Sequence, residues 1–341
     1  MKRRLLAVLL GPLLFASAHA ASPPIALVIH GGAGTISPST MTPEREQAYQ
    51  AALARALNAG YQILEQGGSS LDAVTQAVVS MENEPLFNAG KGAVYTFEGT
   101  HELDAAIMRG EDRAAGAVAG VMHIQNPILL ARAVMEHSEH VMLAGAGAEA
   151  FAKQQGMALV DNHYFDTPFR FEALEKAKKA LTASPHQAAL RLSPAFPPQW
   201  NIGTVGAVAI DRLGNVSAAT STGGMTAKRY GRIGDAPVIG AGTFADNQSC
   251  AVSATGHGEF FIRYQVAADI CARVKYGKIP VQQAADQVIQ QTLAPIGGTG
   301  GVIFIDAHGQ LGWSFNTEGM YRAQKVAGKP PIFGIYQQNL P

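Results

Sequence analysis

A threonine directly after a glycine marks a sharp change in the character of this chain. Thr204 follows Gly203, and the apolar run 205–210 begins at once, with the length and β-branched content of a buried strand. This arrangement suits a hydrolase whose nucleophile becomes a chain terminus. The Thr204 hydroxyl attacks the Gly203 carbonyl, the bond between the two residues breaks, and the freed α-amine then activates the same hydroxyl. The sequence therefore predicts a self-cleavage site at Gly203–Thr204.

Polar residues after this strand could serve the same chemistry. Thr222 lies two positions after Thr220 on the returning strand, so both face one side of the sheet, from which Thr222 could orient Thr204. Arg232 and Asp235 stand three residues apart in a glycine-flanked loop. A substrate with an α-carboxylate and an α-ammonium group needs a guanidinium for the first and a carboxylate for the second. A surface ion pair is the alternative interpretation of these two residues.

Several ordered motifs resemble those of one enzyme family. They occupy residues 30–34 (HGGAG), 203–206 (GTVG), 220–226 (TSTGGMT), 231–235 (GRIGD), 254–259 (ATGHGE) and 316–322 (NTEGMYR). With these motifs the chain resembles the plant-type asparaginase (isoaspartyl peptidase) family of N-terminal nucleophile hydrolases, over nearly the whole mature chain. The resemblance implies an α+β fold, a four-layer αββα sandwich, and an (αβ)2 assembly.

The resemblance also implies roles for matching residues. It assigns catalysis to Thr204, Thr222, Thr255 and Gly256, and substrate binding to Arg232, Asp235, Gly256, Gly258 and Asn88. Thr222 would orient the nucleophile, and Thr255 with Gly256 would form the oxyanion hole. Arg232 would hold the carboxylate of an aspartyl or asparaginyl group, and Asp235 its amine. His257 departs from the family pattern, which has a small polar residue there, and this bears on substrate preference. A turn asparagine is the alternative for Asn88.

The loop 82–92 resembles the loop that forms a structural sodium site in this family. The implied ligands are the main-chain carbonyls of Met81, Glu82, Glu84, Phe87, Ala89 and Lys91. Carbonyl cages suit hard cations and depend little on side-chain identity. No cofactor is expected for catalysis.

Composition indicates an exported protein. Residues 1–20 read as a signal peptide, with Lys2, Arg3 and Arg4 before an apolar core and a small-residue cleavage site at 18–20. Removing three of the 26 basic residues leaves 23 against 26 acidic ones, a net charge of −3. This weak acidity is not typical of nucleic-acid or membrane-surface binding. We expect a periplasmic location, with no membrane contact after signal removal.

The remaining pattern predicts strands and helices in alternation. Expected strands are 25–29, 93–96, 103–108, 116–122, 141–144, 205–210, 216–221, 251–255, 301–306 and 311–315. Expected helices start at Pro43, after an N-cap at Thr42, at Ser69, and at Pro127, with others at 259–276 and 281–293. Periodicity alone indicates two layers of antiparallel strands flanked by helices.

The proline-rich segment 166–200 is interpreted as a surface linker with a charged helical patch at 172–179. Cleavage would thus give an α subunit, 21–203, ending in this flexible linker (about 166–203), and a β subunit, 204–341, within one folded domain. Cys250 and Cys271 are read as small buried hydrophobes, although an exported protein could pair them.

The resemblance, together with Thr204 as nucleophile, implies a hydrolase that acts on β-aspartyl peptide bonds and on the L-asparagine side-chain amide through a β-aspartyl-threonine ester. Its expected partners are a small-molecule or short-peptide substrate and the second chain of the same precursor. Glycosylasparaginase is the nearest enzyme alternative, because it shares the fold and nucleophile. A non-catalytic binding protein for aspartate or asparagine is the rival from another class, and it would remain uncleaved.

Overall fold

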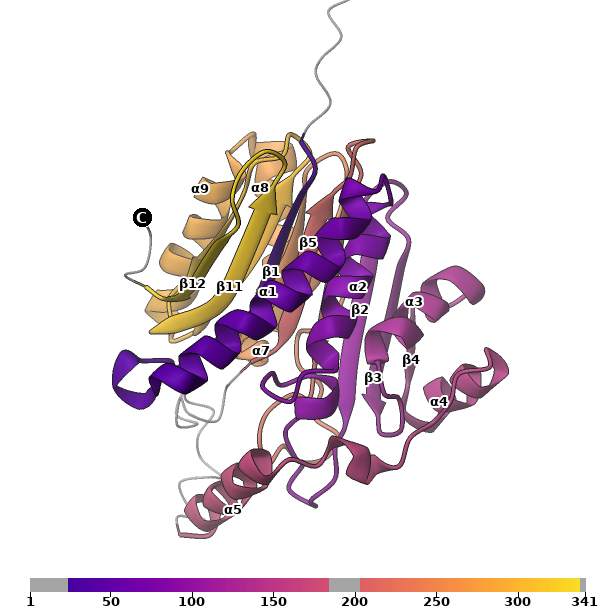
Figure 1. Ribbon diagram of the computed structural model, residues 1–341, viewed down its shortest axis with the longest axis vertical. Coiled ribbons are helices and arrows are strands. Elements are labelled where there is room, and N and C mark those ends of the chain that lie inside the picture. Colours follow the sequence, from indigo (N-terminus) through magenta and orange to yellow (C-terminus); the bar gives the residue numbers. More distant parts are fainter. Residues whose placement is uncertain (1–23, 184–202, 338–341) are drawn as a thin grey trace, which may run out of the picture.

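Two mainly antiparallel sheets lie face to face in this protein (Figure 1). The computed structural model describes residues 24–183 and 203–337. Within these residues, the larger sheet has eight strands in the order β12 (Ile332–Tyr336), β11 (Gly319–Val326), β1 (Ala26–Gly34), β5 (Val205–Ile210), β6 (Val216–Thr222), β2 (Leu103–Arg109), β3 (Ala115–Val121) and β4 (Met142–Ala144). The smaller has four, in the order β10 (Leu311–Phe315), β9 (Gly300–Asp306), β8 (Cys250–Gly256) and β7 (Thr243–Ala245). Only β3 and β4 pair in parallel among these strands.

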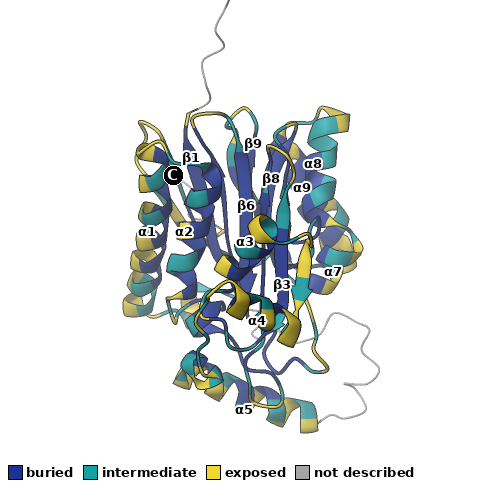
Figure 2. Ribbon diagram, turned by 90° about the vertical axis from the view of Figure 1, so that its right-hand side faces the viewer, coloured by how far each residue is buried: buried dark blue, intermediate teal, exposed yellow. Residues whose placement is uncertain are grey.

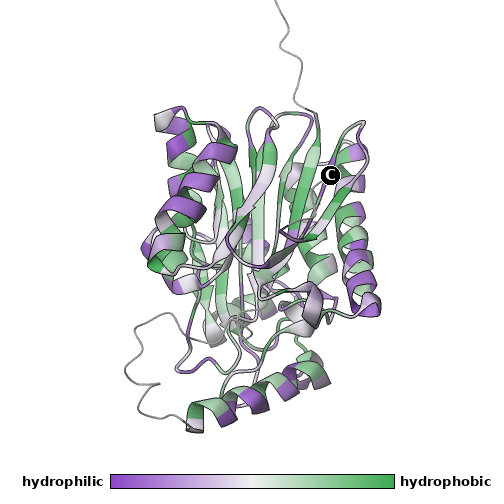
Figure 3. Cartoon of the chain, turned by 90° about the vertical axis from the view of Figure 1, so that its left-hand side faces the viewer, coloured by the Kyte–Doolittle hydropathy of each residue, from purple (hydrophilic) through white to green (hydrophobic). Residues whose placement is uncertain are grey.

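Helices cover the outer face of each sheet (Figures 1 and 2). The larger sheet carries α1 (Pro43–Glu65), α2 (Ser70–Glu82) and α3 (Pro127–His137), and the smaller carries α8 (Val266–Gly277) and α9 (Val281–Asp286). The remaining α-helices in the described residues are α4 (Gly145–Gln154), α5 (Pro168–Ala183) and α7 (Gly258–Arg263). Hydrophilic residues face outward on the helices while the strands between them are largely hydrophobic (Figure 3).

Alternation along the strands produces three apolar layers. Leu27 and Ile29 of β1 point into the core beneath α1 and α2, whereas Ala26 and Val28 point into the core between the sheets. In the smaller sheet, Val302 and Phe304 of β9 face α8 and α9, while Ile303 and Ile305 face the larger sheet. β1 and β9 thus contribute apolar side chains to the layers on both of their faces, and the predicted four-layer αββα sandwich is confirmed.

Helix starts follow the predicted capping chemistry. The Thr42 hydroxyl accepts the Arg45 N–H at 3.3 Å, and Pro43 occupies the first turn of α1. At α2, the Ser69 hydroxyl accepts the Asp72 N–H at 3.1 Å. Both predicted N-termini are confirmed.

Some predicted elements differ from the observed ones. Residues 93–96 form no strand; only Thr96 makes an isolated bridge, to Lys228. The helix expected at 259–276 is divided between α7 and α8, because Gln265 adopts a left-handed conformation at φ +49°. The helix expected at 281–293 changes at Gln287 from α9 to a π-helical turn, Gln287–Leu293.

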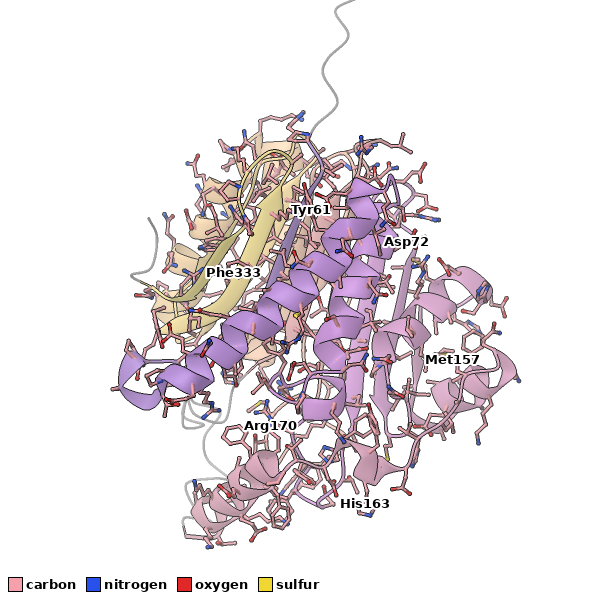
Figure 4. All side chains as sticks on the ribbon, in the orientation of Figure 1. Tyr61, Asp72, Met157, His163, Arg170 and Phe333 are labelled. Carbon is pink, nitrogen blue, oxygen red and sulfur yellow. A yellow bond between two sulfur atoms is a disulfide. The ribbon has the colours of Figure 1, made fainter. Side chains whose placement is uncertain are left out.

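The segment interpreted as a linker begins with a docked helix. Helix α5 spans Pro168–Ala183, longer than the predicted patch, and buries Leu174 and Ala177. Arg170 is also buried, with its Nε donating to the Gly92 carbonyl at 2.8 Å, and it points from α5 toward the body of the molecule (Figure 4). The described half of the segment is therefore a docked helix that contains the predicted helical patch. Its other half, 184–202, and the signal peptide lie outside the described residues.

Cys250 and Cys271 form a disulfide that joins β8 to α8, with 5.3 Å between their Cα atoms. The prediction of two unpaired thiols is wrong. Both residues are buried among apolar neighbours, as expected, but the strand and the helix bring their Cα atoms within bonding range.

Candidate active site

Thr204 lies at the start of β5, the strand between β1 and β6 in the larger sheet. Its Oγ1 donates a hydrogen bond to Thr222 Oγ1 at 3.1 Å, across the β5–β6 pair. Thr222 Oγ1 also accepts the Gly224 N–H at 3.0 Å. The predicted orienting contact between the two threonines is thus present, and it depends on β5 and β6 pairing up to their adjacent ends.

The Gly203–Thr204 peptide bond is held in an unusual backbone conformation. Gly203 has φ +101°, a region that favours glycine, and its carbonyl oxygen accepts the Asn88 N–H at 3.2 Å. Gly32 packs directly on Gly203, so closely that a Cβ at Gly32 would overlap the Gly203 Cα. The Asn88 side chain is fixed as well, because its Nδ2 donates to the Gly224 carbonyl at 2.7 Å. A hydrogen-bond donor therefore already lies on the carbonyl that Thr204 would attack.

Thr255 and Gly256 come from β8 of the smaller sheet, so the site lies between the ends of both sheets. Thr255 Oγ1 accepts the Ala33 N–H at 3.2 Å, which leaves its own proton free to be donated. A Cβ at Gly256 would lie 2.5 Å from the Thr299 carbonyl oxygen. Only glycine fits this position, where the backbone closes against β9.

Arg232 and Asp235 lie together, but they do not pair with each other. A Cβ placed on Gly258 would be 2.9 Å from both Arg232 Nη2 and Asp235 Oδ1. Arg232 instead makes a two-pronged ion pair with Glu259, at 3.0 Å from Nε to Oε1 and 2.9 Å from Nη2 to Oε2. Asp235 Oδ2 is buried without a hydrogen-bond partner. Burial raises the pKa of Asp235 to about 7, although the charge of Arg232 opposes this shift.

All the predicted catalytic and substrate-binding residues except Gly258 line one pocket. Its lining comprises Asn88, Gly203, Thr204, Thr222, Gly224, Met225, Arg232, Gly234, Asp235, Thr255 and Gly256. The cavity measures only about 20 Å³, room for about one water molecule, with Gly203 as part of its wall. The arrangement combines threonine hydroxyl groups, backbone N–H groups, a guanidinium and a carboxyl group, which together could serve nucleophilic attack on a carbonyl.

A buried polar chain behind Thr204 was not anticipated from the sequence. His30, from β1, has Nδ1 3.0 Å from the Thr204 carbonyl oxygen and Nε2 3.0 Å from Ser253 Oγ. Ser253 Oγ is 2.7 Å from Thr220 Oγ1, which accepts from Thr243 Oγ1 at 2.7 Å. Burial lowers the pKa of His30 to about 3, so its ring is neutral. The only sequence signal was the position of His30 in the first motif.

The loop 81–92 has a tightly wound backbone. A Cβ at Gly90 would overlap the Glu82 carbonyl oxygen, and one at Gly92 would overlap that of Phe87. The carbonyl oxygens of Glu82 and Phe87 thus lie against glycines, and main-chain oxygens are ligands that suit a hard cation. Among the described residues, no cluster of three or more His, Cys, Asp or Glu side chains could hold a metal ion.

A family model and several named proteins match nearly the whole of this chain. A family model described as asparaginase matches residues 23–334. An isoaspartyl peptidase of Salmonella typhimurium is 50% identical over 313 residues, covering 92% of this chain and 98% of the relative. An isoaspartyl peptidase of Escherichia coli is likewise 50% identical, over 92% of this chain and 96% of its own. The human isoaspartyl peptidase/L-asparaginase is 40% identical over 90% of this chain and 94% of its own.

Helices in the described ranges are unsuited to crossing a bilayer. None of those between residues 24 and 183 or between 203 and 337 combines the length and apolar character that a membrane span requires.

Proposed function

This chain belongs to the asparaginase family of hydrolases, and we propose that it is a self-cleaving isoaspartyl peptidase that also hydrolyses L-asparagine. The observation that carries the proposal is the hydrogen bond from Thr204 Oγ1 to Thr222 Oγ1, in a pocket that Arg232 and Asp235 also line. A nucleophile and two groups complementary to an α-amino acid end thus meet within one small volume.

Self-cleavage would begin at the Gly203 carbonyl. The Thr204 oxygen attacks the carbonyl carbon, and its proton passes to the Thr204 nitrogen as the peptide bond breaks, leaving an ester between Gly203 and the Thr204 side chain. Water then hydrolyses this ester, which frees the Gly203 carboxylate, the Thr204 hydroxyl and the α-amine. The Asn88 N–H on the Gly203 oxygen supports this step, because it would stabilise the oxyanion.

Substrate hydrolysis would repeat this chemistry with the free α-amine as base. The amine accepts the Thr204 hydroxyl proton, and the oxygen attacks the β-carbonyl of an aspartyl or asparaginyl group. The Thr255 hydroxyl and the backbone at Gly256 would stabilise the oxyanion. Ammonia or an amino acid leaves with a proton from the amine, and water hydrolyses the β-aspartyl ester to release aspartate. Arg232 would bind the α-carboxylate and Asp235 the α-ammonium group.

Cleavage would also open the pocket. The space of about 20 Å³ is too small for an aspartyl group, and Gly203 forms part of its wall. Departure of Gly203 from Thr204 would enlarge the cavity where the β-amide must enter. The uncleaved chain is therefore proposed to be an inactive precursor.

Intact-mass measurement of the purified protein under denaturing conditions tests this proposal, with N-terminal sequencing of any fragments. We expect two chains, the smaller beginning Thr204-Val205-Gly206, and release of aspartate from a β-aspartyl dipeptide. The variant Thr204→Ala should stay in one piece and release none. A wild-type chain that remains whole, and binds aspartate without turnover, would favour the binding-protein alternative.

We also propose that the loop 81–92 binds a sodium ion through the carbonyls of Met81, Glu82, Glu84, Phe87, Ala89 and Lys91. The close backbone packing at Gly90 and Gly92 supports this proposal. Arg170 binds the Gly92 and Leu86 carbonyls, which are outside the proposed ligand set. Thermal unfolding in sodium chloride and in choline chloride of equal ionic strength tests the proposal. Sodium should raise Tm, and Gly90→Ala should abolish that difference; equal Tm values for the wild type would exclude the site.

Export and assembly are proposed alongside this activity. The disulfide between Cys250 and Cys271 is consistent with an oxidising compartment, such as the periplasm.

The two products of cleavage would remain together, because β5 pairs with β1 of the other product in one sheet. We propose that two such pairs form an (αβ)2 assembly. Cell fractionation and light scattering test the two points: a cytosolic, unprocessed chain would contradict export, and a single αβ pair would contradict the assembly.

A further inference from the structure

Arg232 uses one edge of its guanidinium within the protein and leaves another available. Nε and Nη2 both donate to Glu259, at 3.0 and 2.9 Å. Three donors remain, two on Nη1 and one on Nη2, and one proton from each of these nitrogens forms the end-on edge of the planar group. An α-carboxylate can dock on that edge with two parallel hydrogen bonds. Glu259 thus determines which way the free edge of Arg232 points.

Two glycines keep this edge accessible. A Cβ on Gly234 would come within 2.7 Å of Arg232 Nη1, and one on Gly258 within 2.9 Å of Nη2. Because Asp235 Oδ1 lies at the same 2.9 Å from the Gly258 position, the guanidinium edge and the carboxyl group border one space. An α-ammonium and an α-carboxylate are separated by a single carbon, so the two groups of a free aspartyl end fit side by side there.

The Glu259 side chain is 47% exposed, so a further contact is needed to hold it in one rotamer. His257 supplies it: its Nε2 lies 3.1 Å from Glu259 Oε2, the oxygen that also accepts from Arg232 Nη2. Burial raises the pKa of Glu259, but hydrogen bonds from His257 and Arg232 outweigh this and hold the pKa well below its usual value. The carboxylate is therefore ionised. Both of its oxygens are thereby occupied and its rotamer is fixed.

His257 is in turn anchored by the fold. Its side chain is only 13% exposed and lies against the Phe260 ring, with 5.1 Å between centroids. Its backbone N–H donates to the Thr299 carbonyl at 2.9 Å, beside Gly256. The imidazole lines no part of the pocket, so it acts on a ligand only through Glu259 and Arg232.

We propose that His257 is a positioning residue, which holds Glu259 so that the end-on edge of Arg232 meets the α-carboxylate of the substrate. The inference rests on the proposed function, since it deepens the account of how that site recognises an unblocked aspartyl end. It predicts that the effect of His257 depends on the α-carboxylate of the ligand and is absent when this group is neutral.

Calorimetric binding of two ligands isolates this effect. L-Aspartate carries the α-carboxylate, whereas L-isoasparagine has a neutral α-carboxamide in its place and is otherwise the same. We expect His257→Ala to weaken L-aspartate binding by about tenfold and L-isoasparagine binding by less than about twofold, the difference of one charge-assisted contact. His257→Gln should restore most of the L-aspartate affinity, because its amide N–H can replace the Nε2 donor. In kinetics with a β-aspartyl dipeptide, His257→Ala should raise KM about as much while kcat changes by less than about twofold.

A matched control is available elsewhere in the fold. His123 pairs with Glu149 through Nδ1 and Oε2 at 3.0 Å, and neither residue lines the pocket. His123→Ala removes a similar contact between a histidine and a glutamate and should leave both affinities at their wild-type values. The inference would be overturned if His257→Ala weakened the binding of both ligands equally or of neither. It would also be overturned if His257→Gln restored no affinity, or if the wild-type protein did not bind L-aspartate.

The same experiments separate the inference from the proposed function. A wild-type chain that neither cleaves itself nor releases aspartate from asparagine and β-aspartyl dipeptides would refute the function. The comparison of L-aspartate with L-isoasparagine measures binding alone, so on a processed chain it decides the role of His257 even if that chain hydrolyses neither asparagine nor β-aspartyl dipeptides.

Discussion

Asp235 is buried with no hydrogen-bond partner on Oδ2, although the proposed function requires it to bind an ammonium group. Burial alone favours the neutral acid, and the neighbouring charge of Arg232 compensates only in part. An incoming ammonium group would supply the missing partner and favour the ionised form. Binding at this residue should therefore be coupled to the release of a proton.

This coupling predicts a pH dependence of ligand affinity. Since the pKa of Asp235 in the free protein is about 7, L-aspartate binding should weaken about tenfold per unit as pH falls below 7. L-Malate, which has a hydroxyl instead of the ammonium group, should not weaken over the same range. Binding measured between pH 5.5 and 8.5 checks this, and Asp235→Asn should remove the difference in slope. Parallel slopes for the two ligands in the wild type would contradict it.

Thr222 supports a second prediction at the residue scale, because its oxygen accepts from both Thr204 Oγ1 and the Gly224 N–H. Thr222→Val removes the acceptor but keeps the shape of the side chain. Loss of orientation should slow self-cleavage and lower kcat by about 10²-fold. Thr222→Ser keeps the acceptor and should remain within about tenfold of the wild type. Cleavage followed by gel and turnover of the processed fraction test this, and a fully active valine variant would exclude an orienting role.

At the scale of elements, β8 both carries Thr255 and is tied to α8 by the disulfide. The bond closes a loop of 21 residues, which in the chain-entropy model contributes about 3 kcal/mol to the free energy of unfolding. We expect the double variant Cys250→Ala, Cys271→Ala to lose about that amount in urea denaturation. Reducing agent should destabilise the wild type alone. An unchanged transition in the double variant would show that packing of β8 against α8 suffices.

Some elements were predictable because local chemistry defines them. Thr42 and Ser69 mark helix starts through hydrogen bonds to residues three positions ahead, and the turn between β5 and β6 is equally local. β11 was missed, because its sequence becomes polar toward Val326 and only its place between β12 and β1 makes it a strand. The break at Gln265 likewise has no signal in its residue type.

In the candidate site, too, the contacts that depend on tertiary packing could not be predicted from the sequence. The sequence indicated that Thr222, Arg232 and Asp235 belong near Thr204, and one pocket contains all four. It did not indicate that Arg232 pairs with Glu259, 27 residues later, in preference to Asp235. Which carboxylate an arginine meets depends on the packing of β8 and α7, and spacing along the chain does not record it. For the same reason the disulfide escaped prediction.

At the scale of the whole molecule, the helical layer and the sheet beneath it are joined by a buried carboxyl group. Glu82, at the end of α2, is fully buried; its Oε1 accepts from Ser221 Oγ of β6 at 2.7 Å and from the Ile128 N–H of α3 at 3.0 Å. Its Oε2 has no partner. Desolvation raises the pKa of Glu82 to about 7, against the hydrogen bonds that favour its charged form.

A raised folded-state pKa makes stability fall with increasing pH. The contribution of Glu82 is complete below its ordinary pKa of 4.5 and is lost as pH rises through about 7. The loss between pH 5 and pH 9 amounts to about 3 kcal/mol at most. Asp235, with a pKa of about 7, acts in the same direction.

Urea unfolding of the Thr204→Ala variant at several pH values tests this coupling, because in a continuous chain unfolding is not accompanied by separation of two subunits. Adding Glu82→Gln should reduce the loss of stability between pH 6 and pH 9, since glutamine keeps an acceptor for Ser221 and Ile128 without the buried charge. Adding Asp235→Asn should flatten the profile further. Glu139→Gln, at an 88% exposed side chain, serves as the control and should leave the profile unchanged. If Glu82→Gln leaves the slope intact, the carboxyl group is already neutral or hydrated across this range, and the pH dependence arises elsewhere in the molecule.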